Sequence, residues 1–149
     1  MFLVAISNYF IIRSRLCVQV TSGAQKIIML YRYWGKVIKG KSRGKELGFR
    51  TANTRLHQTI PEGIYISTCK IEGERYRSVS FVGAAKTFSE TKVFAETYIF
   101  DFDMNIYGQW ISVQLLKKIR GNKKFASKEE LIKQIKLDVD EVRAYFKER

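Results

Sequence analysis

Short runs of alternating apolar and polar residues occupy most of the chain from residue 33 onward. They cover residues 33–39, 64–71, 75–82, 93–102 and 109–119, and turn residues separate several of them, at 61–63, 73 and 103–108. A period of two predicts strands that turn one face toward a core. Because the strands follow one another closely, the pattern favours an antiparallel meander or Greek-key barrel over β-α-β units.

A helix is expected at the end of the chain. Ser127 and Glu130 have the spacing of a capping box, in which the hydroxyl accepts from a backbone amide and the carboxylate reaches back to the helix start. An apolar stripe at helical spacing follows, formed by Leu131, Ile135, Val139, Val142 and Phe146. We therefore expect one helix that packs against the barrel.

The first thirty residues differ from the rest. They show no strand alternation, and Ser22 and Gly23 interrupt any helix. The first twelve residues are apolar but too short to span a bilayer, and no basic segment precedes them, as one would in a secretory signal. We expect a leader or the remnant of an upstream domain at 1–30 and one domain at 31–149. The expected location is the cytoplasm, with organelle targeting through the basic N-terminus as the alternative.

The chain has 149 residues and a formal net charge of +13. Such a charge favours anionic partners, although a solvated lysine-rich surface explains it about as well. Cys17 and Cys69 lie far apart and match no metal-binding spacing, which fits two reduced thiols. His57 is the only histidine, so histidine-based metal clusters and Ser-His triads are not expected.

A glycine-rich basic segment at 40–48 comes before two candidate metal ligands. Glycines let a backbone approach an anion closely, but the segment is not a Walker A sequence, and a flexible basic hairpin explains it about as well. Thr51 and Asn53 follow, and on an extended backbone their side chains point the same way. They present two neutral oxygens, which suits Mg²⁺. Ordinary turn or strand chemistry is the alternative.

Glu96 is the most informative single residue. Within the expected strand 93–102, alternation places it on one face with Phe94, Tyr98, Phe100 and Phe102. A carboxylate among aromatic rings is costly to bury unless it is paired or its pKa is raised. Such a group is a candidate general base. The alternative is a solvent-facing strand on which Glu96 meets water.

In their order and spacing, these segments resemble the riboflavin kinase family, most closely the C-terminal kinase module of prokaryotic bifunctional riboflavin kinase/FAD synthetases. The matches include Gly-Lys-Val-Ile-Lys-Gly at 35–40, Leu-Gly-Phe-Arg-Thr-Ala-Asn at 47–53, Ala-Glu-Thr-Tyr-Ile at 95–99, Ile-Tyr-Gly at 106–108 and Lys-Phe-Ala-Ser at 124–127. The resemblance implies a mainly β fold, a six-stranded antiparallel barrel with a C-terminal helix. It also implies transfer of the ATP γ-phosphate to the ribityl 5′-hydroxyl of riboflavin, which yields FMN and ADP.

The resemblance assigns roles to individual residues. Glu96 matches the catalytic carboxylate, while Thr51 and Asn53 match a Thr-Ala-Asn unit that meets Mg²⁺ and nucleotide phosphate. The implied nucleotide-binding residues are Gly40, Lys45, Thr51, Asn53, Ile99, Asp101 and Tyr107. The implied flavin-binding residues are Arg120, Lys123 and Phe125.

Three positions depart from the family pattern. Arg50 and Lys86 stand where prolines are usual, and Gly121 begins a flavin loop that lacks the usual acidic pair. These departures support an alternative, a degenerate relative that binds flavin or nucleotide with little activity. The least favoured alternative is a basic nucleic-acid-binding barrel, which the charge and the aromatic residues Tyr31, Tyr33 and Trp34 support. We expect a monomer whose partners are riboflavin or FMN and ATP or ADP, with neither a membrane nor a nucleic acid as a partner.

Overall fold

The computed structural model describes residues 30–40, 48–86 and 91–148, without the side chains of 84–86 and 91–92. Lys45 and nearly all of the expected leader at 1–30 therefore lie outside the described residues. Among the described residues, no helix is long and apolar enough to cross a membrane.

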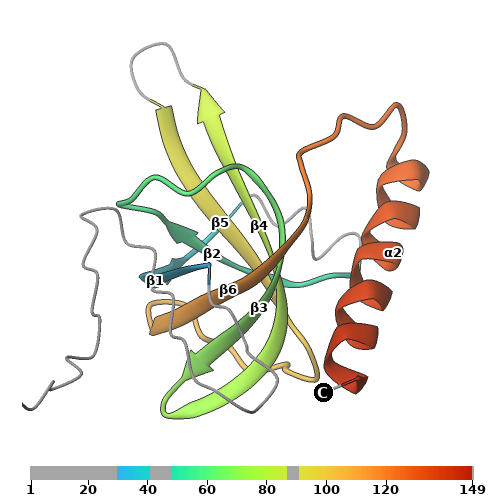
Figure 1. Ribbon diagram of the computed structural model, residues 1–149. Coiled ribbons are helices and arrows are strands. Elements are labelled where there is room, and N and C mark those ends of the chain that lie inside the picture. Colours follow the sequence, from blue (N-terminus) through green and yellow to red (C-terminus); the bar gives the residue numbers. More distant parts are fainter. Residues whose placement is uncertain (1–29, 41–47, 87–90, 149) are drawn as a thin grey trace, which may run out of the picture.

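Six strands form a closed barrel, and one helix stands beside it (Figure 1). The elements are β1 (Tyr31–Ile38), β2 (Thr51–Arg55), β3 (Gly63–Ile71), β4 (Glu74–Lys86), β5 (Thr91–Ile99), β6 (Trp110–Arg120) and α2 (Lys128–Lys147). The order around the barrel is β1-β2-β5-β4-β3-β6, and every neighbouring pair is antiparallel. The prediction of a six-stranded antiparallel barrel with a C-terminal helix is confirmed.

Strand β2 was expected only as extended backbone and not as a separate strand. It has five residues, and only Ala52 and Thr54 turn inward and are buried. Two inward positions are too few to produce a recognisable alternation in the sequence. Its membership of the barrel comes from pairing with β1 and β5.

Strand β5 ends at Ile99, three residues before the predicted boundary. The chain turns at the next two residues, and Asp101 has a φ of 54°, in the left-handed region. Phe100 packs with the helix, while Phe102 packs against the barrel core. Phe100 stays on the outer side with Tyr98, and their ring centres are 5.5 Å apart. The prediction that all five alternating residues share one face was therefore wrong for Phe102.

The barrel interior combines an apolar core with a chain of buried hydroxyl groups. The Tyr33 hydroxyl lies 3.1 Å from Thr97 Oγ1, which lies 2.9 Å from Ser80 Oγ. Ser80 Oγ is 2.9 Å from Ser67 Oγ, and Ser67 Oγ is 2.7 Å from Ser78 Oγ. This chain joins β1, β5, β4 and β3, so each buried hydroxyl has a partner.

Burial also perturbs two ionisable groups inside the barrel. Desolvation raises the pKa of the Tyr33 phenol to about 12, despite the opposing hydrogen bond with Thr97. Desolvation likewise raises the pKa of the Cys69 thiol to about 12. Both groups are therefore protonated at neutral pH, which makes Cys69 a packing residue rather than a reactive thiol.

Helix α2 packs on the outside of the barrel. Val139 and Val142 contact a second apolar cluster that includes Ile66, Phe100 and Leu116. Four residues of the predicted apolar stripe belong to this cluster, Ile135, Val139, Val142 and Phe146, which confirms that this face of the helix packs on the barrel. At the helix start, Ser127 Oγ accepts from the Glu130 amide at 3.2 Å, and Glu130 Oε2 accepts from the Ala126 amide at 3.1 Å.

Candidate active site

Asn53 and Glu96 are directly opposite each other on the outer face of the barrel. They are register partners in the antiparallel pair β2–β5, and both side chains are half-buried. The next inward positions, Ala52 and Ala95, are buried in the core, so alternation turns Asn53 and Glu96 outward. Directly opposed residues have Cβ atoms roughly 5 Å apart. The structure thus brings the predicted carboxylate beside one of the predicted metal ligands.

Thr51 lies one outward position away from Asn53 on β2, opposite Tyr98. Asn53 Nδ2 donates to the Thr51 carbonyl at 3.3 Å, which orients the amide group. Among the described residues, no hydrogen-bond donor faces the other amide atom, Oδ1. The amide oxygen and the Thr51 hydroxyl are therefore the groups available to a cation.

Gly40 packs against the amide of Asn53. A Cβ atom at position 40 would lie 2.5 Å from Asn53 Cγ and Nδ2 and 2.7 Å from Oδ1. Real Cβ atoms do not approach other atoms so closely, so a side chain at this position would displace the amide. Glycine is needed here for close approach rather than for an unusual φ.

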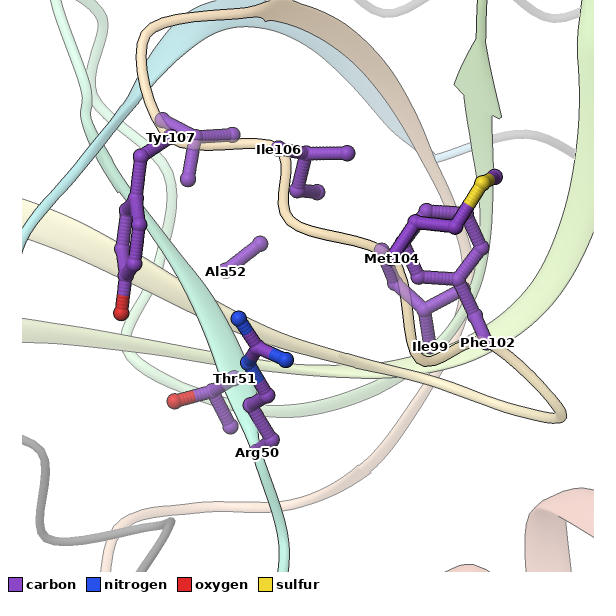
Figure 2. Close-up of a pocket in the computed structure, with 9 residues that line it drawn as sticks. Arg50, Thr51, Ala52, Ile99, Phe102, Met104, Ile106 and Tyr107 are labelled. Atoms are coloured by element: carbon purple, nitrogen blue, oxygen red, sulfur yellow. The ribbon is translucent and has the colours of Figure 1, made fainter.

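An open pocket lies beside Thr51, and its empty space of about 370 Å³ includes open solvent. Figure 2 shows Thr51 and Arg50 on one side, Tyr107 and Ile106 on another, and Phe102 with Met104 across from them. The remaining lining residues are Val37, Ala52 and Ile99. Three of the predicted nucleotide-binding residues, Thr51, Ile99 and Tyr107, therefore line one pocket.

Other predicted nucleotide-binding residues fall outside this lining. Asp101 is exposed at the turn after β5. Asn53 adjoins Thr51, Gly40 adjoins Asn53, and neither lines the pocket itself. Sequence reasoning missed Phe102, Met104 and Ile106, which the turn after β5 brings to the pocket. No alternation signals such residues, because the loop geometry places them.

Arg50 lines the pocket and was noted in the sequence only as a departure from the family pattern. Its Nη1 atom lies 3.4 Å from Asp103 Oδ1, and both side chains are well exposed. Such an exposed pair contributes little to stability. Its position instead puts a cation at the mouth of the pocket.

The predicted flavin-binding residues form a separate cluster between β6 and α2. Arg120 donates two hydrogen bonds to Asp138, from Nε at 2.9 Å and from Nη2 at 2.6 Å. The Arg120 guanidinium and the Lys123 ammonium lie 5.9 and 5.7 Å from the ring centre of Phe125. The three residues are therefore together, and none of them lines the pocket.

The loop that follows Arg120 is attached at one further point, and Asp138 has one further donor. Asn122 Nδ2 donates to Glu62 Oε2 at 2.8 Å, in the turn before β3. Gln134 Nε2 donates to Asp138 Oδ1 at 3.0 Å, so Asp138 has donors from both the strand and its own helix. A buried carboxylate with several charge-assisted donors is a firm anchor.

Comparison with known proteins places this chain in a family. The riboflavin kinase model, described as flavokinase, matches residues 28–146. A bifunctional riboflavin kinase/FMN adenylyltransferase of Haemophilus influenzae is 38% identical over 119 residues, which are 78% of this chain and 39% of that protein. An RNA-binding riboflavin kinase of Bacillus subtilis is 36% identical over 115 residues, 75% of this chain and 50% of that protein.

A solved structure agrees with the sequence relatives. Riboflavin kinase from Trypanosoma brucei superposes with a TM-score of 0.54 at 26% identity, covering 78% of this chain and 79% of that one. The chain spans about two fifths of the length of the Haemophilus relative. With a family model that covers most of the sequence, this chain belongs to the riboflavin kinase family.

Proposed function

We propose that this chain transfers the γ-phosphate of ATP to the 5′-hydroxyl of riboflavin. Members of its family take ATP as co-substrate and bind riboflavin. The observation that carries the proposal is the outward pair Asn53–Glu96 beside Thr51, next to an open pocket. It combines a carboxylate that can accept a proton with neutral oxygens that can face phosphate-bound metal.

The pocket is the proposed nucleotide site. Its apolar walls, with Ile99 and the half-exposed Tyr107, suit the flat base of a nucleotide. Thr51 belongs both to the pocket and to the row that contains Asn53. The nucleoside would therefore occupy the pocket and the phosphates would extend along β2 toward Glu96. Gly40, Lys45 and Asp101 complete the proposed nucleotide contacts.

The oxygens present fit a magnesium ion. Thr51 and Asn53 would hold Mg²⁺, whose chemistry there is to offset the negative charge of the phosphates. The close approach of Gly40 fixes the Asn53 amide, so its oxygen is positioned before a ligand arrives. Among the described residues, no group of three or more His, Cys, Asp or Glu side chains could hold a metal. Phosphate and water would therefore supply the remaining ligands.

Glu96 is the proposed general base. It would accept the proton of the ribityl 5′-hydroxyl as the hydroxyl oxygen forms a bond to the γ-phosphorus and the bond from that phosphorus to the β-phosphate oxygen breaks. The products are FMN and ADP. Most of the rate in such reactions comes from positioning and charge stabilisation.

The flavin would lie against the loop after β6. Phe125 presents a flat ring for stacking, and Lys123 adds positive charge beside it. Arg120 is already bound to Asp138, so its proposed role is to hold this loop in place. We expect riboflavin to bind more tightly when Mg·ADP is present. If the first ligand already orders the loop after β6, the second ligand no longer bears that entropic cost.

Calorimetry with an active-site variant tests the proposal. Asn53→Ala should weaken Mg·ADP binding much more than riboflavin binding, because only the nucleotide needs the amide oxygen. Arg55→Ala is the matched control, since Arg55 is the next outward residue on β2 and is exposed. Equal Mg·ADP affinity in the two variants would refute the assignment of Asn53.

Two further parts of the proposal concern the whole protein. We expect it to act as a monomer in the cytoplasm. The Bacillus relative is also named as RNA-binding.

A further inference from the structure

The outer surface of the barrel is divided into a covered part and an uncovered part. Helix α2 covers the outward apolar residues Ile66 on β3, Val79 on β4 and Leu116 on β6. On β4, the next outward residue, Arg77, still contacts Phe146 of α2. Beyond it, the outward residues Lys70 on β3 and Arg75 on β4 are charged and exposed. This uncovered part continues onto β1, which pairs with β6.

Six outward residues in the uncovered part form what we call the aromatic–basic face. The face crosses four strands that are neighbours in the barrel, β1, β6, β3 and β4. One cross-strand row pairs Trp34 with Ser112, Ser112 with Lys70, and Lys70 with Arg75. The members of the face are Arg32, Trp34, Lys36, Lys70, Arg75 and Trp110.

The two tryptophans of this face are unusually exposed. Trp34 is 60% and Trp110 is 68% exposed, although large apolar side chains normally seek burial. Trp110 is the register partner of Lys36, two residues from Trp34 on β1, so the two indoles are diagonal neighbours. Diagonal Cβ atoms are roughly 7–8 Å apart. The Arg32 guanidinium lies 5.8 Å from the Trp34 ring centre and steadies that indole.

The cations of this face have no carboxylate partner within the part of the chain that the structure describes. Among the described residues, none of Arg32, Lys36, Lys70 and Arg75 takes part in an ion pair. Lys70 and Arg75 are directly opposite each other, an arrangement of like charges that costs stability. The acidic residues nearest to Arg75 in sequence, Glu72 and Glu74, lie at the hairpin between β3 and β4. An anionic partner would relieve the repulsion between Lys70 and Arg75.

We propose that the aromatic–basic face binds single-stranded nucleic acid. Bases stack on Trp34 and Trp110, and Arg32, Lys70 and Arg75 contact the phosphates. An anionic polymer without bases would meet the charges but leave the indoles unused, and a duplex keeps its bases stacked inside. The Asn53–Glu96 pair lies on β2 and β5, outside this face. An oligonucleotide bound here would therefore leave the Asn53–Glu96 pair uncovered.

The chain is well suited to a direct test, because its only two tryptophans both belong to this face. Titrating the full chain with a 12-nucleotide single-stranded RNA, or DNA of the same sequence, should quench tryptophan fluorescence. Trp34→Ala and Trp110→Ala, followed with a labelled oligonucleotide, should each weaken binding about 5- to 150-fold, the equivalent of one stacked base. Trp34→Phe should retain most of the affinity, because phenylalanine still stacks.

Salt dependence tests the role of the cations. Lys70→Ala with Arg75→Ala should reduce the slope of log affinity against log salt by about 0.7 for each phosphate that is no longer neutralised. Lys133→Ala with Lys136→Ala removes the same charge from the exposed side of α2 and should leave the slope nearly unchanged. Saturating Mg·ADP should not displace the oligonucleotide.

Several results would overturn the proposal. One is oligonucleotide binding that neither tryptophan substitution weakens. Another is displacement of the oligonucleotide by Mg·ADP. A third is an equal salt slope in the Lys70→Ala/Arg75→Ala and Lys133→Ala/Lys136→Ala variants. The proposal would also be overturned if polyglutamate, phosphatidylserine vesicles or the corresponding duplex bound as tightly as the single strand. Each of these results would show that the face recognises negative charge and not exposed bases. If RNA binds more tightly than DNA, the natural ligand is RNA; the reverse order indicates DNA.

Discussion

Asn53 on β2 and Glu96 on β5 form a directly opposed pair on the outer face of the barrel. The two residues are 43 positions apart along the sequence, and only the antiparallel pairing of β2 with β5 brings them together. Glu96 thus has Asn53 opposite it on β2 and Phe81 opposite it on β4. The pairing places the proposed general base beside a proposed metal ligand.

The contact between Gly40 and Asn53 predicts a specific kinetic effect. Gly40→Ala places a Cβ about 2.5 Å from the amide, so the amide must rotate or β1 and β2 must separate. We expect a loss of kcat/KM for ATP of roughly 10-fold or more, equivalent to about 1.4 kcal/mol of lost positioning. Steady-state kinetics at saturating riboflavin measures this change in kcat/KM for ATP.

Gly73→Ala is the control for that experiment. Gly73 lies at the tip of the β3–β4 hairpin with a φ of 96°, and no other atom would lie within 4 Å of an added Cβ. This variant should lose about 1 kcal/mol of stability from backbone strain while keeping the kinetics of the unmodified chain. Equal catalytic losses in both variants would assign the Gly40 effect to general destabilisation.

The ion pair between Arg120 and Asp138 predicts a selective effect on riboflavin. Asp138→Ala leaves a mostly buried guanidinium without its carboxylate, and we expect a loss of about 3 kcal/mol in the free energy of unfolding. Because Arg120 begins the proposed flavin loop, KM for riboflavin should rise while KM for ATP changes little. Urea unfolding and steady-state kinetics measure the two effects.

A second ion pair between the same two elements provides the matched control. Lys117 on β6 lies 3.7 Å from Glu141 on α2, and both side chains are about half exposed. Glu141→Ala should therefore cost less than about 1 kcal/mol and leave both KM values unchanged. A riboflavin KM that rises equally in the two variants would show that any loosening of α2 is sufficient, and that Asp138 has no special role.

The buried Tyr33 and Cys69 predict loss of stability at alkaline pH. Burial raises both pKa values to about 12, from ordinary values of 10.0 and 9.0. A raised pKa favours the protonated form in the folded state, so this contribution is fully present below about pH 9 and is lost as the pH rises toward 12. For Tyr33 the contribution is on the order of 3 kcal/mol.

Urea unfolding at a series of pH values tests this expectation. Tyr33→Phe should be less stable than the unmodified chain at pH 8, because Thr97 loses a hydrogen-bond partner. Between pH 10 and 12 its stability should fall less steeply, since it has no buried phenol to ionise. Parallel curves for the two proteins would mean that Tyr33 does not titrate on unfolding in this range.

Sequence pattern and family resemblance together predicted the architecture, and they nominated residues of the candidate site. Clear alternation located β1, β3, β4 and β6, and the capping box located the start of α2. The short strand β2 and the early end of β5 were missed, since the first has two inward residues and the second depends on the turn at Asp101. Local pattern carries no information about such turns.

For the candidate site as well, the sequence indicated individual residues but not their arrangement. Thr51, Asn53 and Glu96 were identified from the sequence, but their mutual placement depends on the β2–β5 register. Phe102 and Met104 line the pocket because of the loop that follows β5, and Asp138 was unremarkable as one polar residue in a helix.

The aromatic–basic face was only half visible in the sequence. Trp34 was a candidate for nucleic-acid binding and is exposed, but Tyr33, a candidate for the same reason, is buried in the core. Trp110 was not considered, because the register between β1 and β6 is what brings it beside Trp34. A surface assembled from several strands depends on pairing that a local pattern does not encode.

The most direct test of the central claim is the reaction itself. The purified chain is incubated with riboflavin, ATP and Mg²⁺, and the flavins are separated by chromatography with fluorescence detection, alongside Glu96→Gln. We predict that the unmodified chain forms FMN and that the variant forms it roughly 10²- to 10⁴-fold more slowly, while still binding riboflavin and ADP. No FMN from the unmodified chain, or a similar rate from Glu96→Gln, would contradict the account.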